Sequence, residues 1–509
     1  MTRSAWLNDD QRPSFPPLTT DVEADVGIIG GGITGVMSAY LLKNAGLRVA
    51  LVDRGRCGDG ETSHTTAHLT YVTDARLHEL ADRFGREAAQ AAWDGGATAI
   101  DLVEHVVQAE EIDCDFTRLP GYLHAAWDES SPRDRESLNR DGETAMEFGF
   151  SASLCDFVPV ANRPGVRFAN QAIFHPLRFL AGLTPRIDGG GSHVFEQTSI
   201  DEVTDRGTLR SGDREIRCRH VVVATHVPLP GKSGLATATW LQTRLAAYSS
   251  YVVAARLPAE TAEPGLWWDT SDPYVYLRVE DRDGSQTAIL GGEDHKTGQK
   301  DDTGEPFRKL VERLHRIFPQ AVVTDRWSGQ VIETNDGLPL IGSTDERQYI
   351  ATGFAGNGMT FGTLSAMIVR DAVMGQTNPW SELFDPTRVR VNGGLWRYLK
   401  ENVDYPRYLI QDRLTSRRTE RSDDLANGTG RIQRLDGERA AVFRDDDGEL
   451  HCVSAVCTHM GCLVRWNPAE RTWDCPCHGS RFGVDGDVIA GPAETPLDRL
   501  VPGRSAATS

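Results

Sequence analysis

Short apolar runs, separated by glycines and by one stretch with helical spacing, open the chain. Residues 25–29 form the first apolar run, residues 35–45 place apolar side chains at helical spacing, and residues 48–52 form a second apolar run. A strand, a turn, a helix and a strand in this order predict a βαβ unit with parallel strands. Residues 74–108, rich in Ala, Glu and Arg, predict further helix.

Farther along, the pattern changes to short β-like runs between Gly and Pro turns, which indicates a second, mostly antiparallel sheet. Such runs are residues 221–224, 251–254, 275–279 and 288–290. The first 24 residues are polar and Pro-rich and predict an arm on the surface, and charged residues 381–425 predict a linker. Short strands resume after it, so we expect an all-β domain over residues 426–509.

Composition narrows the possible partners. The 509 residues carry 54 Lys and Arg against 73 Asp and Glu, a formal net charge of −19. This balance argues against nucleic acid or an anionic membrane as the main partner, because phosphate groups are bound by clustered cations. The sequence has no run of about 18 apolar residues and no apolar signal core at its start, which predicts a cytoplasmic protein without a membrane span.

A glycine pattern lies between the first strand and the first helix. Gly30, Gly32 and Gly35 fit G-x-G-x-x-G, and Asp53 closes the second strand. Gly30 permits a tight turn, Gly32 lets the backbone approach a pyrophosphate, and Gly35 lets the helix pack on the strand. Asp53 can accept a hydrogen bond from a ribose hydroxyl. The spacing predicts a Rossmann-like dinucleotide site and fits both FAD and NAD.

Cysteines and histidines gather near the C-terminus, where five of the nine cysteines fall between Cys452 and Cys477. Two half-sites, each with a Cys and a His, are formed by Cys457, His459, Cys475 and His478. This set suits a [2Fe–2S] cluster with two cysteines on one iron and two histidines on the other. It also suits a tetrahedral zinc site, although Cys462 and Cys477 exceed the needs of four ligands.

Several glycine-rich blocks resemble the D-amino-acid-oxidase superfamily of FAD enzymes. They are residues 58–63, which include Thr62 and Ser63, then Trp327-Ser-Gly-Gln, residues 336–342 and residues 352–362. In that superfamily the last block closes over the flavin. The resemblance therefore implies FAD, with Gly353, Gly356, Gly358, Met359 and Thr360 near it, and an α+β antiparallel-sheet substrate domain interleaved with the FAD-binding domain.

The two cysteine boxes, CTHMGC and CPCHGS, resemble those of Rieske proteins. The resemblance implies that Cys457, His459, Cys475 and His478 hold a [2Fe–2S] cluster, and that Cys462 and Cys477 form a disulfide. The expected domains are an arm at 1–24, an FAD-dependent oxidoreductase at 25–380, a linker at 381–425 and a Rieske domain at 426–509. FAD binding is assigned mainly to residues 25–75 and 330–375, and the substrate domain mainly to 110–330.

The combination of both expected domains in one chain resembles bacterial Rieske-containing FAD-dependent oxidoreductases. The resemblance implies a class of enzyme rather than a reaction. From the two redox cofactors we expect a dehydrogenase that oxidises a small amine-like molecule by hydride transfer to FAD, with single electrons passing to the cluster and to an external acceptor protein. Two alternatives stay open. Electrons could enter at the cluster from a donor protein and leave from FAD, or the protein could be a redox carrier or sensor without catalysis.

Candidate substrate residues come from one strand and one loop. Tyr274, Tyr276 and Arg278 occupy alternate positions and are expected to face the flavin together. Arg278 could clamp a substrate carboxylate or form an ion pair on the sheet. His64 stands where some relatives bind the flavin covalently, or it hydrogen-bonds nearby. The strand after Trp327 lacks the arginine that amine-oxidising relatives use for a carboxylate, which argues against an α-amino acid.

Overall fold

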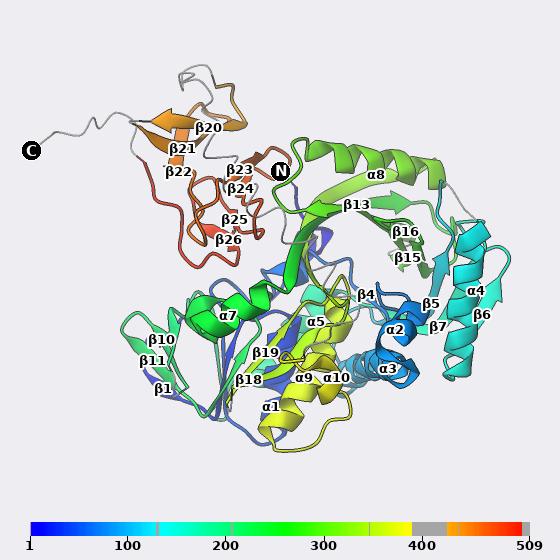
Figure 1. The fold of residues 1–509 in the computed structure, drawn as a ribbon, viewed down its shortest axis with the longest axis horizontal. Helices are drawn as coiled ribbons and strands as arrows, with labels where there is room; N and C mark the ends of the chain where they lie inside the picture. The colour runs from blue at the N-terminus through cyan, green and yellow to red at the C-terminus, as the bar shows by residue number, and fades with distance from the viewer. Residues whose placement is uncertain are drawn as a thin grey trace, which may run out of the picture.

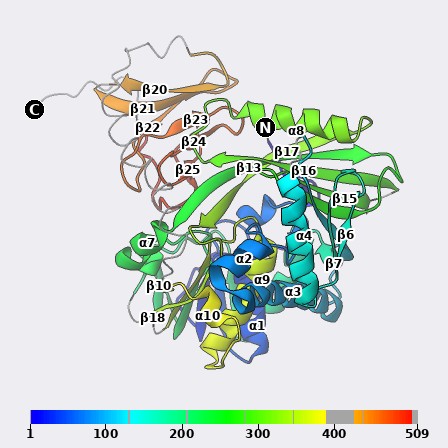
Figure 2. The ribbon, with the colours of Figure 1, turned by 45° about the vertical axis from the view of Figure 1, so that its right-hand side comes forward.

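The chain forms a large module and a smaller C-terminal domain (Figure 1). A computed structural model describes residues 2–128, 132–204, 207–282, 284–345, 347–388, 425–435 and 437–500. We call residues 2–388 the large module and residues 425–500 the C-terminal domain. In both views the C-terminal domain lies above α7 and beside one end of β13 (Figures 1 and 2). Most of the expected linker, residues 389–424, lies outside the described residues.

The first sheet of the large module contains the predicted βαβ unit. Its six strands follow the order β18-β19-β12-β2-β3-β8, and β12, β2, β3 and β8 run parallel. Their bounds are β18 Leu340–Asp345, β19 Gln348–Thr352, β12 His220–Val223, β2 Val26–Ile29, β3 Val49–Val52 and β8 His193–Phe195. The range expected to be mainly substrate domain, residues 110–330, therefore contributes two strands, β8 and β12, to this sheet.

A second, larger sheet forms the other layer of the large module, with α8 across one face (Figure 1). Its strand order is β17-β13-β16-β15-β14-β5-β7-β4, with β6 paired to β7; the pairing is antiparallel except between β14 and β5. The bounds are β17 Val322–Thr334, β13 Leu245–Leu257, β16 Ser285–Lys296, β15 Tyr276–Arg282, β14 Gly265–Asp269, β5 Thr117–His124, β7 Gly165–Ile173, β4 His68–Leu69 and β6 Ala152–Cys155. The predicted interleaved antiparallel sheet is confirmed.

Helices cover these sheets and form the main hydrophobic core between them. They are α1 Ile33–Asn44, α2 Leu77–Phe84, α3 Arg86–Ala109, α4 Pro132–Glu147, α5 Pro176–Ile187, α6 Pro230–Ser233, α7 Leu235–Gln242, α8 Gly304–Ile317, α9 Gly358–Val373 and α10 Ser381–Phe384, with short 3-10 turns η1 Ala5–Asp9 and η2 Glu61–Ser63. The stretch predicted as one helix, residues 74–108, is divided at Gly85, whose φ of 89° cannot continue a helix. Residues 33–42 of α1 are all buried, as expected for a helix between layers.

The N-terminal arm, most of whose described residues are exposed or half-buried, is anchored by one buried side chain. Trp6 is only 1% exposed, and its indole Nε1 donates to the carbonyl of Thr65 at 2.6 Å. Farther on, β1 (Val22–Glu23) joins a small sheet with β11 (Arg214–Arg217), β10 (Thr208–Ser211) and β9 (Glu202–Val203). One buried tryptophan outweighs the polar composition of the arm, because a fully buried aromatic side chain contributes about 1.5–3 kcal/mol.

The C-terminal domain is all-β, as predicted. One sheet has β20 Thr429–Leu435, β21 Glu438–Arg444 and β22 Leu450–Ser454, and the other has β23 Arg465–Asn467, β24 Thr472–Asp474, β25 Arg481–Phe482 and β26 Val488–Ala490. All the strand pairs are antiparallel. The two cysteine boxes follow β22 and β24, so both lie in loops. Across the described residues of the whole chain, no helix is long and apolar enough to cross a membrane.

The close approach of α1 to the turn before it generates a first prediction. A Cβ at Gly35 would lie 1.8 Å from the carbonyl oxygen of Gly30, a backbone atom that cannot move away alone. Gly35→Ala is expected to displace the first turn of α1, to cost about 1–3 kcal/mol of unfolding free energy as overpacking does, and to lower FAD retention. Urea unfolding and the flavin-to-protein absorbance ratio measure both effects.

Gly483→Ala is the matched control, because its added Cβ would lie 3.8 Å from the nearest heavy atom outside the adjoining residues, the carbonyl oxygen of Asp487. Wild-type FAD content and stability in Gly35→Ala would contradict the role assigned to this contact.

Candidate active site and metal centre

The turn between β2 and α1 holds the three predicted glycines in distinct roles. Gly30 has a φ of 107°, and a Cβ there would lie 2.4 Å from the carbonyl oxygen of Ala224. Gly32 precedes the first residue of α1, and a Cβ there would meet only the Thr62 hydroxyl, at 3.1 Å. Thr62 Oγ1 accepts the N–H of Ile33 at 3.0 Å, which places the loop of residues 58–63 beside the N-terminus of α1.

Asp53, at the end of β3, organises the same turn. One carboxylate oxygen accepts the N–H of Gly31 at 2.6 Å, and the other accepts the N–H of Gly55 at 2.7 Å. Burial raises the pKa of Asp53, and these two backbone bonds oppose the rise. Each carboxylate oxygen can accept a second hydrogen bond, so a contact with a ribose hydroxyl stays a prediction.

A second helix begins beside α1. The loop before α9 contains Gly353 and Gly356, whose φ angles are 76° and 80°. Within α9, Thr360 Oγ1 donates to the carbonyl of Thr70 at 2.9 Å, and Met359 is buried. Two helices that begin near one another present their free N–H groups and the positive ends of their dipoles to one region.

The residues of this region fit FAD. Gly32 and Gly356, which have no side chains, lie at or just before two helix starts, and the loop with Thr62 and Ser63 lies beside the start of α1. A pyrophosphate takes backbone N–H donors at such a start, and a reduced isoalloxazine ring, which is anionic, is stabilised by a helix N-terminus. FAD supplies the hydride-accepting chemistry when it is bound.

Next to the α9 loop lies a group of residues that we call the acid–tyrosine cluster: Asp74, Ser250, Tyr274, Tyr276 and Asp294. The Tyr274 hydroxyl donates to Asp74 at 2.9 Å, and the Tyr276 and Ser250 hydroxyls lie 2.8 Å apart. Asp294 lies close enough for its charge to act on both tyrosines. The two tyrosine rings have centroids 5.7 Å apart.

The acid–tyrosine cluster lies against Gly356, in the loop before α9 that is predicted to lie beside the flavin. A Cβ at Gly356 would lie 3.1 Å from the Tyr274 hydroxyl and 3.4 Å from an Asp74 carboxylate oxygen. Burial and then the charge of Glu333 hold the pKa of Asp74 well above its usual range. The Asp74 side chain is nevertheless exposed to solvent, so the neighbouring protein atoms surround this carboxyl without covering it.

Arg278 is not part of the acid–tyrosine cluster. Its contacts correct the expectation that it clamps a substrate carboxylate. Its side chain is only 1% exposed, and its Nη2 donates to Glu280. Its Nη1 donates at 3.0–3.3 Å to the carbonyls of Thr66, Ala67 and Phe174. The guanidinium also lies over the Trp6 ring, 5.2 Å from its centroid. The second interpretation, an ion pair on the sheet, is the one that the structure shows.

His64 directly follows η2 in the large module. Its Nδ1 is 3.2 Å from both the Ser63 hydroxyl and the carbonyl of Gly60, and its own carbonyl accepts the indole N–H of Trp327 at 2.8 Å. These contacts hold His64 within the loop expected beside the flavin. Covalent attachment through its ring stays a prediction.

The two cysteine boxes form matching turns in the C-terminal domain. The N–H of Gly461 donates to the carbonyl of Cys457 at 3.0 Å, and the N–H of Gly479 donates to the carbonyl of Cys475 at 3.1 Å. Both glycines have a φ near 75°, a conformation that other residues rarely adopt. The turns present a Cys and a His from each box toward a common centre, where the His459 and His478 ring centroids are 5.0 Å apart.

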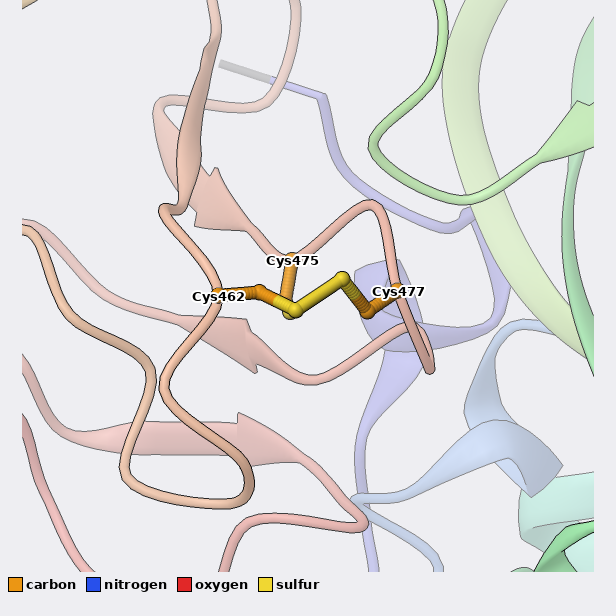
Figure 3. A group of neighbouring side chains, drawn as sticks. All are labelled: Cys462, Cys475 and Cys477. Atoms are coloured by element: carbon orange, nitrogen blue, oxygen red, sulfur yellow. A yellow bond between two sulfur atoms is a disulfide. The ribbon is translucent and has the colours of Figure 1, made fainter. Parts of the chain in front are cut away.

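A disulfide joins the two turns. Cys462 and Cys477 are bonded, as predicted, and the Cys475 sulfur lies within 4.8 Å of both of their sulfur atoms (Figure 3). Sulfurs that are bonded to each other cannot serve as thiolate ligands. Of these three cysteines, only Cys475 is therefore left to bind a metal.

The remaining thiols suit iron ligation. The Cys475 thiol hydrogen-bonds to the Cys457 sulfur, and the Ser480 hydroxyl and the backbone N–H groups of His459 and Met460 also reach that sulfur. The Cys475 contact is the largest cause that lowers the pKa of Cys457, to about 7, although burial opposes it. Two free thiols and two imidazoles in paired loops fit a Rieske cluster, which carries out one-electron transfer when it is bound.

Glutamines of the large module hold both cluster turns. Gln330 Nε2 donates to the carbonyl of Gly479 at 2.8 Å, and Gln299 Nε2 donates to the carbonyl of Pro476 at 3.0 Å. Gln242 Oε1 lies 3.1 Å from His459 Nε2. The predicted cluster ligands are thus docked against the module that carries the predicted FAD residues.

Several residues of these sites were not predicted from the sequence. Asp74, Asp294 and Gln242 belong to no motif, and Gln330 appears only as the last letter of the Trp327 block. No periodicity connects position 74 with 274 and 294, because three separate elements bring them together. Only a burial pattern that marked these polar positions as interior would have drawn attention to them.

The ligand set generates a second prediction. Cys475→Ser is expected to abolish the iron–sulfur absorption and the EPR signal of the reduced cluster while FAD stays bound, because the FAD residues belong to the large module. Cys452→Ser is the control, since Cys452 is a buried cysteine of β22 in the same domain. Iron analysis and EPR of the dithionite-reduced protein distinguish them, and a normal cluster in Cys475→Ser would remove Cys475 from the ligand set.

The comparisons with known proteins agree with this geometry. A family model described as FAD dependent oxidoreductase matches residues 25–372, and one described as Rieske [2Fe-2S] domain matches residues 418–501. The chain is 33% identical over 503 residues to YhfW of Bacillus subtilis (strain 168), named as a Rieske 2Fe-2S iron-sulfur protein, with 97% of each chain covered.

More distant relatives match the large module. Gamma-glutamylputrescine oxidoreductase of Escherichia coli (strain K12) is 22% identical over 390 residues, which cover 73% of this chain and 87% of that protein. Glycine oxidase from Geobacillus kaustophilus shares the fold, with a TM-score of 0.61 and 18% identity over 72% of this chain and 99% of that chain. The chain therefore belongs to the FAD-dependent oxidoreductase family, as an enzyme that uses FAD and, in its C-terminal Rieske domain, a [2Fe–2S] cluster.

Proposed function

We propose that this enzyme is a dehydrogenase that oxidises a small amine-like substrate by hydride transfer to FAD, with single electrons then passing through the Rieske cluster to an external acceptor protein. The proposal rests on the acid–tyrosine cluster beside the flavin loop. The chain's own task is to bind the amine, orient its α-carbon and exclude water from the region between the two sheets.

The chemistry of the acid–tyrosine cluster suits a positively charged substrate. Asp74 and Asp294 carry carboxyl groups, and the rings of Tyr274 and Tyr276 present π faces at a centroid distance of 5.7 Å. Carboxylates and aromatic faces are both attracted to an ammonium group, most strongly where water is excluded. The raised pKa of Asp294 expresses the cost of removing its negative charge from water, a cost that a bound cation would offset.

The position of Arg278 also supports an amine without a clamped carboxylate. Its guanidinium is engaged with Glu280, with three carbonyls and with the Trp6 ring. Releasing it to bind a substrate would leave Glu280 as a buried, unpaired charge, which costs about 3–5 kcal/mol. The relative named gamma-glutamylputrescine oxidoreductase, whose name contains that of a diamine, agrees with an amine substrate class.

The direction of electron flow can be tested by anaerobic mixing with a panel of small alkylamines and matched α-amino acids. We expect a productive amine to bleach the flavin absorbance before the EPR signal of the reduced cluster appears, because the substrate delivers its electrons to FAD. If no amine bleaches the flavin, and an external reductant reduces the cluster before the flavin, electrons run in the opposite direction and the dehydrogenase proposal fails.

Asp294 generates a pH prediction. Burial, and next the charge of Glu293, raise the pKa of Asp294 to about 6. The ionisable groups that its charge reaches are Asp74, Tyr251, Tyr274 and Tyr276. Below pH 6 the carboxyl is protonated and loses its attraction for a cation, so the KM for the amine should rise as the pH falls from 7 to 5.

Asp294→Asn should raise the KM about tenfold, the equivalent of about 1.4 kcal/mol, and should remove the dependence near pH 6. Asp301→Asn, which removes an exposed acid at the surface, is the control for net charge. An unchanged KM profile in Asp294→Asn would reject the cation site, while bleaching of the flavin by amines would still support the dehydrogenase.

A further inference from the structure

Gln242, the last residue of α7, connects the large module to one of the histidines of the cluster site. Its amide Nε2 donates to the carbonyl of Pro228 at 2.7 Å, and its Oε1 lies 3.1 Å from His459 Nε2. A carbonyl oxygen can only accept a hydrogen bond, so the NH₂ group of the amide must face Pro228. The oxygen of the amide must then face His459.

This orientation determines the tautomer of His459. An amide oxygen has no proton to donate, so the hydrogen bond requires the proton to be on His459 Nε2. In the neutral ring the lone pair is then on Nδ1. His459 therefore offers Nδ1 to the metal, and its Nε2 proton points away from the cluster centre into the large module.

We propose that Gln242 is a positioning residue for the [2Fe–2S] cluster: by accepting the Nε2 proton of His459 from the other domain, it lowers the reduction potential of the cluster. A hydrogen-bond acceptor on the remote N–H of a metal-bound histidine raises the basicity of the ligand. A more basic imidazole donates more electron density and favours ferric over ferrous iron. The inference uses His459 as a ligand and is independent of the substrate and of the direction of electron flow.

The surroundings of Gln242 make this contact part of the domain interface. Just before α7, the N–H of Gly231 donates to Glu494 at 2.8 Å, and Lys232 forms an ion pair with the same carboxylate. Glu494 belongs to the C-terminal domain, close enough to His459 for its charge to act on the ring. Because the acceptor and the histidine come from different domains, the lowered potential exists only while the domains are docked. Docking and cluster potential are therefore linked.

The experiment measures the midpoint potential of the cluster in the full-length holoenzyme by EPR-monitored redox titration. Gln242→Leu removes the acceptor and should raise the potential, with about a tenfold change in the ratio of reduced to oxidised cluster at fixed ambient potential, or about 59 mV for one electron. Gln242→Glu keeps an acceptor and adds negative charge, so it should lower the potential.

Gln299→Leu is the matched control. It removes an interdomain hydrogen bond from the same side-chain type to the carbonyl of Pro476, in the other cluster turn, without touching a histidine ring. It should leave the potential at the wild-type value. Iron content, flavin content and the urea unfolding curve of each variant show whether the protein is intact, and Gln242→Met provides a second neutral variant if Gln242→Leu does not fold.

A second readout tests the tautomer directly. Electron–nuclear double resonance on the reduced cluster, with histidine labelled with 15N at Nδ1 alone or at Nε2 alone, should give the strong coupling of a metal-bound nitrogen only for the Nδ1 label. The inference is overturned if Nε2 is the coupled nitrogen. It is also overturned if intact Gln242→Leu, or Gln242→Met in its place, keeps the wild-type potential, or if the Leu and Glu variants shift it in the same direction.

Discussion

The side chain and backbone of Gln330 join the two loops on which both redox centres depend. Its backbone N–H donates to Glu61 in the loop beside α1, at 2.7 Å, and its side-chain amide donates to the carbonyl of Gly479 in a cluster turn, at 2.8 Å. A Cβ at Gly479 would lie 2.5 Å from the Ala247 side chain, so only glycine allows this approach. Gln330 therefore connects the loop that is predicted to lie beside the flavin directly to a turn of the predicted cluster site.

Buried charges reinforce this interface. Glu470 pairs with Arg481 within the C-terminal domain, and the ion pair of Lys232 with Glu494 joins the large module to that domain. Burial alone would raise the pKa of Glu470, but the charge of Arg481 outweighs it and the pKa is lowered. A buried pair adds little net stability, yet the loss of one partner is expensive. A pair that joins the two domains, as Lys232 and Glu494 do, favours one docked arrangement, which fits an enzyme that must keep two cofactors at a constant separation.

The N-terminal arm has a comparable role on the substrate side. Trp6 packs against the Arg278 guanidinium and hydrogen-bonds to the carbonyl of Thr65, next to the carbonyl of Thr66 that accepts from Arg278. This arrangement holds Arg278 in the sheet, away from the acid–tyrosine cluster. The region beside the flavin loop is left with carboxyl and phenol groups, and this is why the proposed substrate is a cation.

The sequence by itself determined the features that depend on residues close to one another in the chain. The βαβ unit, the glycines at the start of α1 and the two cysteine boxes all depend on spacings of a few residues, which the backbone converts directly into geometry, and the Cys462–Cys477 disulfide was implied by the resemblance of the boxes to Rieske proteins. The tertiary structure decided what each distant side chain faces. Arg278 bonds to residues more than 100 positions away, and Gln242 reaches His459 across 217. Such contacts follow from packing two sheets and a separate domain together, and local periodicity carries no information about them.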